Sequence, residues 1–231
     1  MPARCLIVNA DDLGLSPAVN DGVFAAHERG IVTSASLMVR QGAAAAAAAA
    51  LPEAPGLAVG LHLDLAQWDY AAGEWMKAYG RCDTESTGAV EAECHAQLEL
   101  FRDLLGRDPT HLDSHQHLHL SEPTATVAAR IADDLGVPLR GREVRFEGGF
   151  YGQSGKGECY PAGIEPGALA ALIESLPPGW TELGCHPAAA PVPQSSYDSE
   201  RMVELRTLCD PGVRRAVERV AATLRSFADL A

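Results

Sequence analysis

Strand-like and helix-like segments alternate along most of the chain, and this alternation is the feature that most restricts its fold. The first segment, residues 4–10, is apolar and β-branched, as in a buried parallel strand. Ser16 and Pro17 are typical of the N-cap and first position of a helix, which is predicted to end at Gly30. Repeated βα units predict a parallel sheet, either closed as a barrel or open and doubly wound.

The other elements follow from the same patterns of hydrophobicity, capping residues and breakers. Further strands are predicted at residues 31–39, 57–65, 110–120, 139–146, 181–185 and 224–230. Further helices are predicted at residues 43–50, 88–106, 124–135 and 165–176, with a last one that begins at Asp210-Pro211. Residues 66–88 and 147–163 are predicted to be long loops. About seven strands in so short a chain favour a distorted or incomplete (β/α) barrel, and the absence of linkers and repeats predicts a single domain over residues 1–231.

Composition excludes several classes of partner. The formal net charge is −13, which argues against nucleic-acid binding because no basic patch could neutralise a phosphate backbone. The six cysteines show no CxxC spacing, so free thiols in a reducing compartment are expected. No apolar run resembles a signal peptide or a membrane span, which predicts a cytoplasmic protein without a membrane partner. The sequence does not decide the oligomeric state, and a homo-oligomer stays open.

Polar residues cluster at the places where several predicted strands end. The four clusters are Asp11-Asp12, His62 with Asp64, residues 113–119, and His186. Because the carboxyl ends of parallel strands meet on one face, these clusters are expected to converge on one site. Asp11 and Asp12 taken alone fit a solvated turn, but their position directly after a buried strand favours a functional role.

The most specific signal is an alternation of ionisable residues in the predicted strand 110–120. Asp113, His115, His117 and His119 recur at every second position, so a strand would place all four on one face. Unpaired buried polar groups cost several kcal/mol each, so this face requires a metal ion or a polar pocket. His27, His95 and His111 have no such neighbours in the sequence, and they are interpreted as surface or supporting residues.

One carboxylate and two imidazoles, with coordination positions left open for water, suit a catalytic divalent ion. A second carboxylate could accept the proton of the attacking water, and a histidine could protonate the leaving group. Asp11 and Asp12 would supply both carboxylates, since adjacent residues point in different directions. The donor types fit one divalent ion and leave Zn²⁺ and Mg²⁺ both open.

The motifs resemble those of a known family. NADDLG, VTSASLM, VGLHLDL, THLDSHQHLH and TELGCHP occur in the order seen in the YdjC-like (ChbG-type) carbohydrate deacetylase family, and the later stretch SSYDSERMVELRTLCDP is similar to the C-terminal region of some members. The resemblance implies a distorted (β/α) barrel, a divalent metal ion, and removal of an acetyl group from N-acetylated sugars such as chitin oligosaccharides.

Residue by residue, the resemblance implies Asp11 as general base, Asp12, His62 and His115 as metal ligands, and His186 as general acid. Asp113, His117 and His119 would then support a ligand from behind or contact the substrate. Spacing alone does not decide between His115 and His117, and His115 is favoured. Gln116 stands where the family's frequent DSHHHVH run has its middle histidine, a change that leaves the alternating positions intact.

Two other functions compete with a metal-dependent deacetylase acting on a small carbohydrate. A metal-dependent phosphoesterase would require a pair of metal ions and a basic clamp for the phosphate. A non-catalytic, regulatory sugar-binding domain would need no base beside its metal. Aromatic residues in the two long loops could stack on sugar rings in either of the carbohydrate-binding cases.

Overall fold

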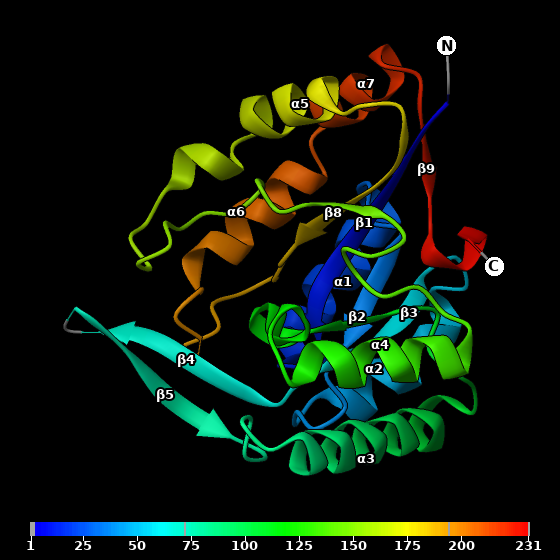
Figure 1. Ribbon diagram of the computed structural model, residues 1–231. Helices are drawn as coiled ribbons and strands as arrows, with labels where there is room; N and C mark the ends of the chain where they lie inside the picture. Colours follow the sequence, from blue (N-terminus) through cyan, green and yellow to red (C-terminus); the bar gives the residue numbers. More distant parts are fainter. Residues whose placement is uncertain (1–2, 72, 194, 231) are drawn as a thin grey trace.

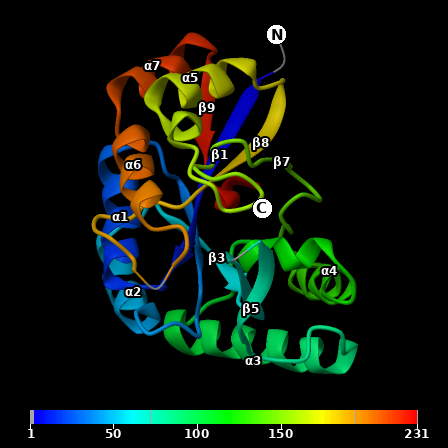
Figure 2. The same ribbon diagram turned by 90° about the vertical axis from the view of Figure 1, so that its left-hand side faces the viewer.

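The computed structural model describes residues 3–71, 73–193 and 195–230, which form a curved parallel sheet surrounded by helices (Figures 1 and 2). The strand order is β6-β3-β2-β1-β8-β7, and β9 pairs with β1. The strands of this sheet are β1 (Arg4–Leu13), β2 (Ser34–Leu37), β3 (Ala58–Leu63), β6 (Leu112–Ser114), β7 (Arg145–Glu147), β8 (Gly179–Cys185) and β9 (Ala222–Arg225). Because β6 and β7 form two edges, the predicted incomplete (β/α) barrel is confirmed.

The helices cover the outside of the sheet (Figure 2). They are α1 (Pro17–Arg29), α2 (Ala44–Ala50), α3 (Thr87–Leu105), α4 (Thr124–Leu135), α5 (Pro166–Ser175), α6 (Ser199–Leu208) and α7 (Pro211–Arg219). Ser16 caps α1 by accepting a hydrogen bond from the Val19 amide, as its place before Pro17 predicts. Gly106 and Gly136 end α3 and α4 in the left-handed conformation, which glycine adopts without steric cost.

Several sequence predictions about elements are wrong. Residues 66–88 are not a loop, because β4 (Ala66–Ala71) and β5 (Glu74–Gly80) form an antiparallel hairpin apart from the main sheet. β5 is almost entirely exposed, so it lacks the buried apolar face by which a strand is recognised. The last strand lies at residues 222–225 rather than 224–230, which end in a short 3-10 helix. The strand predicted at 139–146 is shorter and lies later in the chain, as β7 (Arg145–Glu147). Helix α6 was not predicted.

The core lies between the sheet and the helices. The last eight residues of β1 and all six of β3 are buried, as in parallel strands that are covered on both faces. The six cysteines are all free, as their spacing predicts. Among the described residues, no helix combines the length and the apolar character needed to cross a membrane.

The packing of α1 against the segment after β8 sets the position of His186. A Cβ atom built on Gly22, in the middle of α1, would lie 2.4 Å from the backbone of Ala188, two residues after His186. Backbone cannot move aside as a flexible side chain can, so the two segments must separate if Gly22 gains a side chain.

We therefore expect Gly22→Ala to destabilise the protein by roughly 1–3 kcal/mol, the cost of overpacking, despite the better helix propensity of alanine. Gly167→Ala in α5 is the matched control, because a Cβ there would meet nothing within 4 Å. Urea unfolding of both variants measures the effect. Equal stability of the two variants would show that α1 and the segment after β8 can shift freely.

Candidate metal centre and active site

The site begins where β1 leaves regular strand geometry. Pairing between β1 and β2 shifts its register between Ala10 and Leu13, and Asp12 takes a left-handed backbone conformation with φ of 65°. Such a conformation costs a non-glycine residue about 1–3 kcal/mol and persists where the surroundings impose it. As a result the adjacent side chains of Asp11 and Asp12 contact different partners, as the sequence analysis expected.

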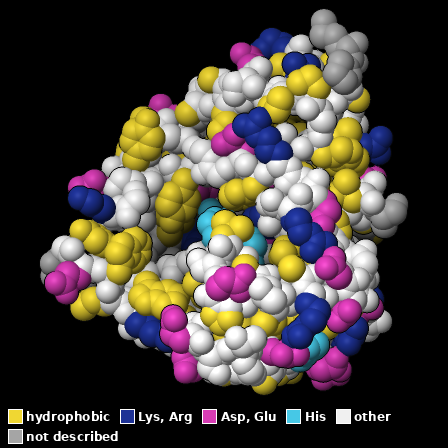
Figure 3. Space-filling view, viewed as in Figure 1, with side chains coloured by type: hydrophobic (Ala, Val, Ile, Leu, Met, Phe, Trp, Pro, Cys, Tyr) yellow, Lys and Arg dark blue, Asp and Glu magenta, His cyan; other side chains and the backbone are white. Residues whose placement is uncertain are grey.

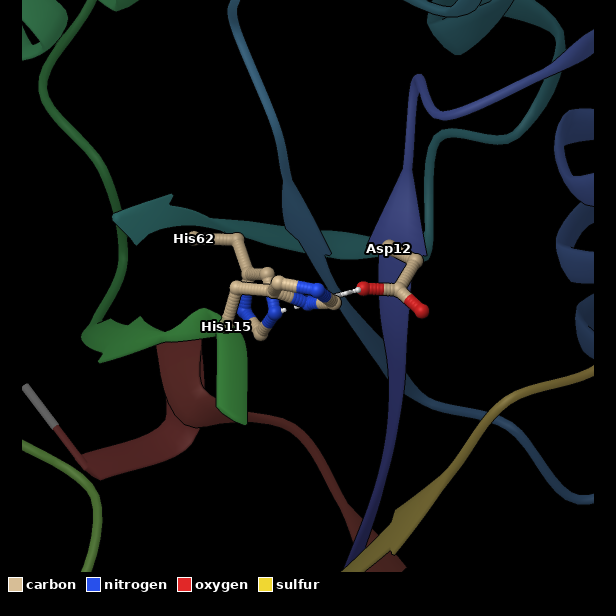
Figure 4. A group of neighbouring side chains, drawn as sticks. All are labelled: Asp12, His62 and His115. Carbon is tan, nitrogen blue, oxygen red and sulfur yellow. Dashed lines mark hydrogen bonds and ion pairs between the residues drawn. The ribbon is translucent and has the colours of Figure 1, made fainter. Parts of the chain in front are cut away.

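Three potential metal ligands meet at this point (Figure 4). Asp12 comes from β1, His62 from β3, and His115 follows β6 directly. The Oδ1 atom of Asp12 lies 3.4 Å from Nε2 of His62 and 3.1 Å from Nδ1 of His115. The structure thus brings together the three residues that the sequence analysis assigned as ligands.

Asp113 supports His62 from behind. Its Oδ1 atom accepts a hydrogen bond from Nδ1 of His62 at 2.7 Å, which leaves Nε2 facing Asp12. Burial opposes a charged imidazole, but the neighbouring Asp113 carboxylate outweighs it and raises the pKa of His62 well above its usual value. The hydroxyl of Ser36 donates to Oδ2 of Asp113 and also bonds to Nε2 of His111. His111 is therefore a buried supporting residue, stacked on Phe227 with ring centroids 3.8 Å apart.

The prediction that Asp113, His115, His117 and His119 share one face of a strand is wrong. β6 ends at Ser114, and residues 115–120 form a 3-10 segment in which Gln116 and His117 have positive φ angles. Period-two alternation applies only to extended backbone, so the histidines point in different directions. His115 reaches Asp12, whereas His119 turns back and bonds to the hydroxyl of Ser114.

His117 lines the pocket and packs edge-to-face against Phe146. Burial lowers the pKa of His117 to about 4, so the ring is neutral near pH 7. Of the two candidates that spacing left open, His115 and not His117 contacts the Asp12 carboxylate.

Arg140 is a buried residue that the sequence analysis did not assign to the site. Only 2% of it is exposed, and its terminal nitrogens bond to both oxygens of Asp11 at 2.7 Å. It also contacts Asp113 at 2.8 Å and Glu182 at 2.7 Å. Burial would raise the pKa of Asp11, but the charge and hydrogen bonds of Arg140, together with the charge of His62, outweigh it, and the net shift is downward.

The second group with metal-ligand character, Asp11, His62 and Asp113, is filled by this guanidinium. A positive charge within 3 Å of both carboxylates takes the place that a cation would occupy. Of the two groups, only the one formed by Asp12, His62 and His115 is open to an ion.

His186 follows β8 at the carboxyl edge of the sheet and lines the pocket. Glu204 in α6 accepts a hydrogen bond from the His186 amide, and its Oε1 lies 3.8 Å from Nδ1 of the ring. The same carboxylate accepts a hydrogen bond from the Tyr197 hydroxyl. Burial favours the neutral ring, but Glu204 outweighs it and raises the pKa of His186 above 6.5.

An acid that protonates the leaving nitrogen is expected across the substrate carbonyl from the base, but His186 does not lie on the side opposite Asp11. Nε2 of His186 lies 3.8 Å from Oδ2 of Asp11, so the two side chains are neighbours. The reason lies in the sheet. Ala10 in β1 pairs with Cys185 in β8, so the next residue of each strand emerges at the same place.

Helix α6 supplies two further residues that the sequence analysis missed. Arg201, 2% exposed, donates to Oδ2 of Asp12 at 2.7 Å, while Glu204 holds His186. Both belong to the stretch SSYDSERMVELRTLCDP. The resemblance of this stretch to other sequences was the signal that could have identified them as site residues. For Arg140 the signal was weaker. An excess of acidic residues at buried strand ends requires a buried positive charge somewhere in the chain.

These residues surround a cavity of about 310 Å³, visible as a hollow with histidine inside and hydrophobic side chains on its rim (Figure 3). Asp11, Asp12 and the His62, His115 and His186 rings line it, together with Phe146, Phe150, Tyr151 and Tyr197. Arg201 is the sole Lys or Arg among the described residues that line it.

The donors fit a divalent ion. A carboxylate oxygen and two imidazole nitrogens, all within 4.8 Å of one another, form the donor set of open catalytic zinc sites. Burial would raise the pKa of Asp12, but Arg201 and His115 outweigh it and hold the pKa well below its usual value, so this carboxylate is ionised. The hydrogen bond from His62 to Asp113 is the outer support that metal-bound histidines usually have.

Comparison with known proteins shows which family the chain belongs to. Residues 5–219 match the model of a family described as YdjC-like protein. The chain belongs to the YdjC-like family. A chitooligosaccharide deacetylase of Serratia marcescens is 33% identical to it, with 98% of this chain and 99% of the relative covered. The family resemblance inferred from the motifs is therefore confirmed.

Solved structures place the YdjC-like chain among known folds. A proposed cellobiose-phosphate cleavage protein from Enterococcus faecalis superposes with a TM-score of 0.82 at 26% identity, over 99% of both chains. A family 4 carbohydrate esterase from Streptomyces lividans, solved in complex with acetate, gives a TM-score of 0.58 at 12% identity, with 97% of this chain and 93% of the esterase covered. At that identity the likeness concerns the fold alone.

The buried cluster around Arg140 leads to a stability prediction. Arg140→Met would leave Asp11, Asp113 and Glu182 buried without their shared counter-charge, which should cost about 3–5 kcal/mol of unfolding free energy. Arg142→Met, which removes an exposed arginine two residues away, is the control and should show no comparable loss. Urea denaturation at neutral pH measures both. A small effect of Arg140→Met would mean that the three carboxylates find another counter-charge.

Proposed function

We propose that this protein is a metal-dependent carbohydrate deacetylase, one catalytic domain that hydrolyses the acetamide of an N-acetylated sugar. The observation that carries the proposal is the meeting of Asp12, His62 and His115 beside Asp11 and His186 in one cavity. The relative from Serratia marcescens that bears the name chitooligosaccharide deacetylase supports it, because the match extends over nearly the full length of both chains.

Asp12, His62 and His115 would hold the ion, and Zn²⁺ or Mg²⁺ fits the mixed carboxylate and imidazole donors. When bound, such an ion supplies Lewis acidity, which polarises a carbonyl and lowers the pKa of water. All other roles fall to side chains of the protein.

Asp11 acts as the general base in this proposal. Arg140 fixes both of its oxygens, and Asn9 donates to Oδ1 at 2.9 Å, so the carboxylate stays ionised and correctly oriented. It accepts one proton from water while the water oxygen bonds to the acetyl carbon. A positively charged partner lowers the basicity of the Asp11 carboxylate, so Arg140 does not make Asp11 a stronger base. Its role in this proposal is to hold the carboxylate in the correct orientation.

His186 acts as the general acid. The nitrogen of an amide leaves only when protonated, and a protonated imidazole beside Glu204 can donate that proton as the C–N bond breaks. The products are acetate and the free amine of the sugar. Because His186 lies 3.8 Å from Asp11, a proton taken up by the base is also close to the acid that must be recharged for the next turnover.

The substrate is a small carbohydrate in this proposal. Aromatic faces and polar groups together line the cavity, and sugar rings offer both apolar faces and hydroxyl groups. Tyr151 and Tyr197 stack on each other with centroids 4.4 Å apart beside His186, and they form an aromatic wall next to the proposed acid.

The phosphoesterase alternative has less support. It requires a second metal ion, but Arg140 fills the second group of carboxylates. It also requires a basic clamp, yet Arg201 is paired with Asp12. A regulatory sugar-binding domain needs no oriented carboxylate and no histidine with a raised pKa beside its metal, and both features are present here.

Acetate release tests the function directly. Protein stripped of metal and reloaded with Zn²⁺ or Mg²⁺ should release acetate from a panel of N-acetylated mono- and oligosaccharides only in the reloaded state.

Asp11→Asn should keep metal binding but lose about 10²–10⁴-fold in kcat, because an amide cannot accept a proton. Near-normal turnover of that variant under saturating metal would assign Asp11 a structural role instead.

The pH profile tests His186 and its partner Glu204. A general acid works only when protonated, so kcat/KM should fall as pH rises through the raised pKa of His186. In Glu204→Gln the opposing charge is lost, the pKa of His186 drops, and the basic limb should move down by about one pH unit or more.

Glu200→Gln is the matched control for Glu204→Gln, because Glu200 lies on the same helix and bonds to Gln153 rather than to His186. His186→Ala should abolish the basic limb on amides yet spare activated esters, whose leaving groups need no proton. Equal loss on both kinds of substrate, or a basic limb that stays in place in Glu204→Gln, would contradict the acid assignment.

A further inference from the structure

Arg201 is a buried arginine bonded directly to a proposed metal ligand, and it takes no part in the proposed acid–base chemistry. We propose that Arg201 is a positioning residue that restricts Asp12 to one-oxygen coordination and keeps coordination positions of the ion free for substrate and water. This inference rests on the proposed function, because it assumes that an ion binds at Asp12, His62 and His115.

The two oxygens of Asp12 have separate partners. Oδ2 accepts a hydrogen bond from Nη2 of Arg201 at 2.7 Å, while Oδ1 lies 3.1 Å from His115 and 3.4 Å from His62. A carboxylate whose second oxygen is bound to a guanidinium presents one oxygen to a cation. Chelation through both oxygens would place the ion against Oδ2 as well, where it would compete with the guanidinium.

The guanidinium is itself held in place. Nε donates to the carbonyl of Tyr197 at 2.7 Å, Nη2 lies 3.4 Å from the Ser195 hydroxyl, and the group lies 5.5 Å from the centre of the Tyr197 ring. With its side chain 2% exposed, Arg201 has little freedom to swing away when an ion arrives. The bond to Asp12 is therefore expected to persist in the metal-bound protein.

The charge of Arg201 has a second consequence. Two charges a few ångströms apart in a buried site interact strongly, so a fixed cation beside Asp12 opposes the binding of another cation. Loss of Arg201 would leave Asp12 with a free oxygen and remove this repulsion. The ion should then bind more tightly, with Asp12 contributing both oxygens, at the expense of positions that catalysis needs open.

Binding and spectroscopy of Co²⁺ test the inference without relying on turnover. In Arg201→Met, Co²⁺ should bind at least about 10-fold more tightly than in the natural protein, a change of about 1.4 kcal/mol. Its visible absorption should weaken, since a higher coordination number lowers the intensity of cobalt bands, and kcat should fall. Arg206→Met is the matched control, an exposed arginine of the same helix, and should match the natural protein in affinity and spectrum.

Arg201→Lys keeps the positive charge but loses the planar guanidinium group. It therefore separates the effect of charge on metal affinity from the effect of the hydrogen bond on Asp12 coordination. Its affinity should stay near that of the natural protein while its cobalt spectrum changes, and it decides the question if circular dichroism shows Arg201→Met unfolded. An affinity and spectrum of Arg201→Met equal to those of Arg206→Met, or weaker binding, would overturn the inference and leave the proposed function standing. Failure of the natural protein to bind Co²⁺ at a single site would overturn the metal site and this inference with it.

Discussion

The side chain of Arg140 is the group on which the rest of the site depends. Asp11, Asp113 and Glu182 come from three different strands, and all three contact this one guanidinium. Three buried carboxylates would repel one another without it, and burial together with repulsion from Asp113 and Asp11 raises the pKa of Glu182 to about 7 despite the arginine. Asp113 in turn holds His62, so the geometry of a proposed metal ligand traces back to Arg140 through one intermediate residue.

A second arginine completes the division of tasks between two neighbouring aspartates. Arg140 orients Asp11 and Arg201 orients Asp12, and the left-handed turn at Asp12 is what directs the two side chains to different partners. Burying ionic groups costs desolvation energy that hydrophobic packing would not incur. The site is therefore expected to be less stable than an apolar equivalent, and its ion pairs serve the orientation of the carboxylates rather than the stability of the fold.

The sequence predicts the fold well where hydrophobic runs are long and buried, as in β1 and β3. It also predicts which strand ends carry Asp12, His62 and His115, because parallel topology brings carboxyl ends together whatever the loops do. It fails at residues 115–120, where positive φ angles at Gln116 and His117 have no signature in the side-chain pattern. Arg140, Arg201 and Glu204 escaped because an arginine or a glutamate in the sequence does not reveal whether it is buried, and only the tertiary structure supplies their partners.

The position of β9 ties the two ends of the chain to the same strand. The first half of β1, Arg4 to Ile7, pairs with β9, and the second half pairs with β2. Phe227, just after β9, stacks on His111, which reaches Asp113 through Ser36. During synthesis the edge of β1 at Arg4 to Ile7 is therefore covered only after β9 has left the ribosome. Contacts of such large sequence separation are formed slowly, so the pairing of β9 with β1 and the stacking of Phe227 behind Asp113 are expected among the last events of folding.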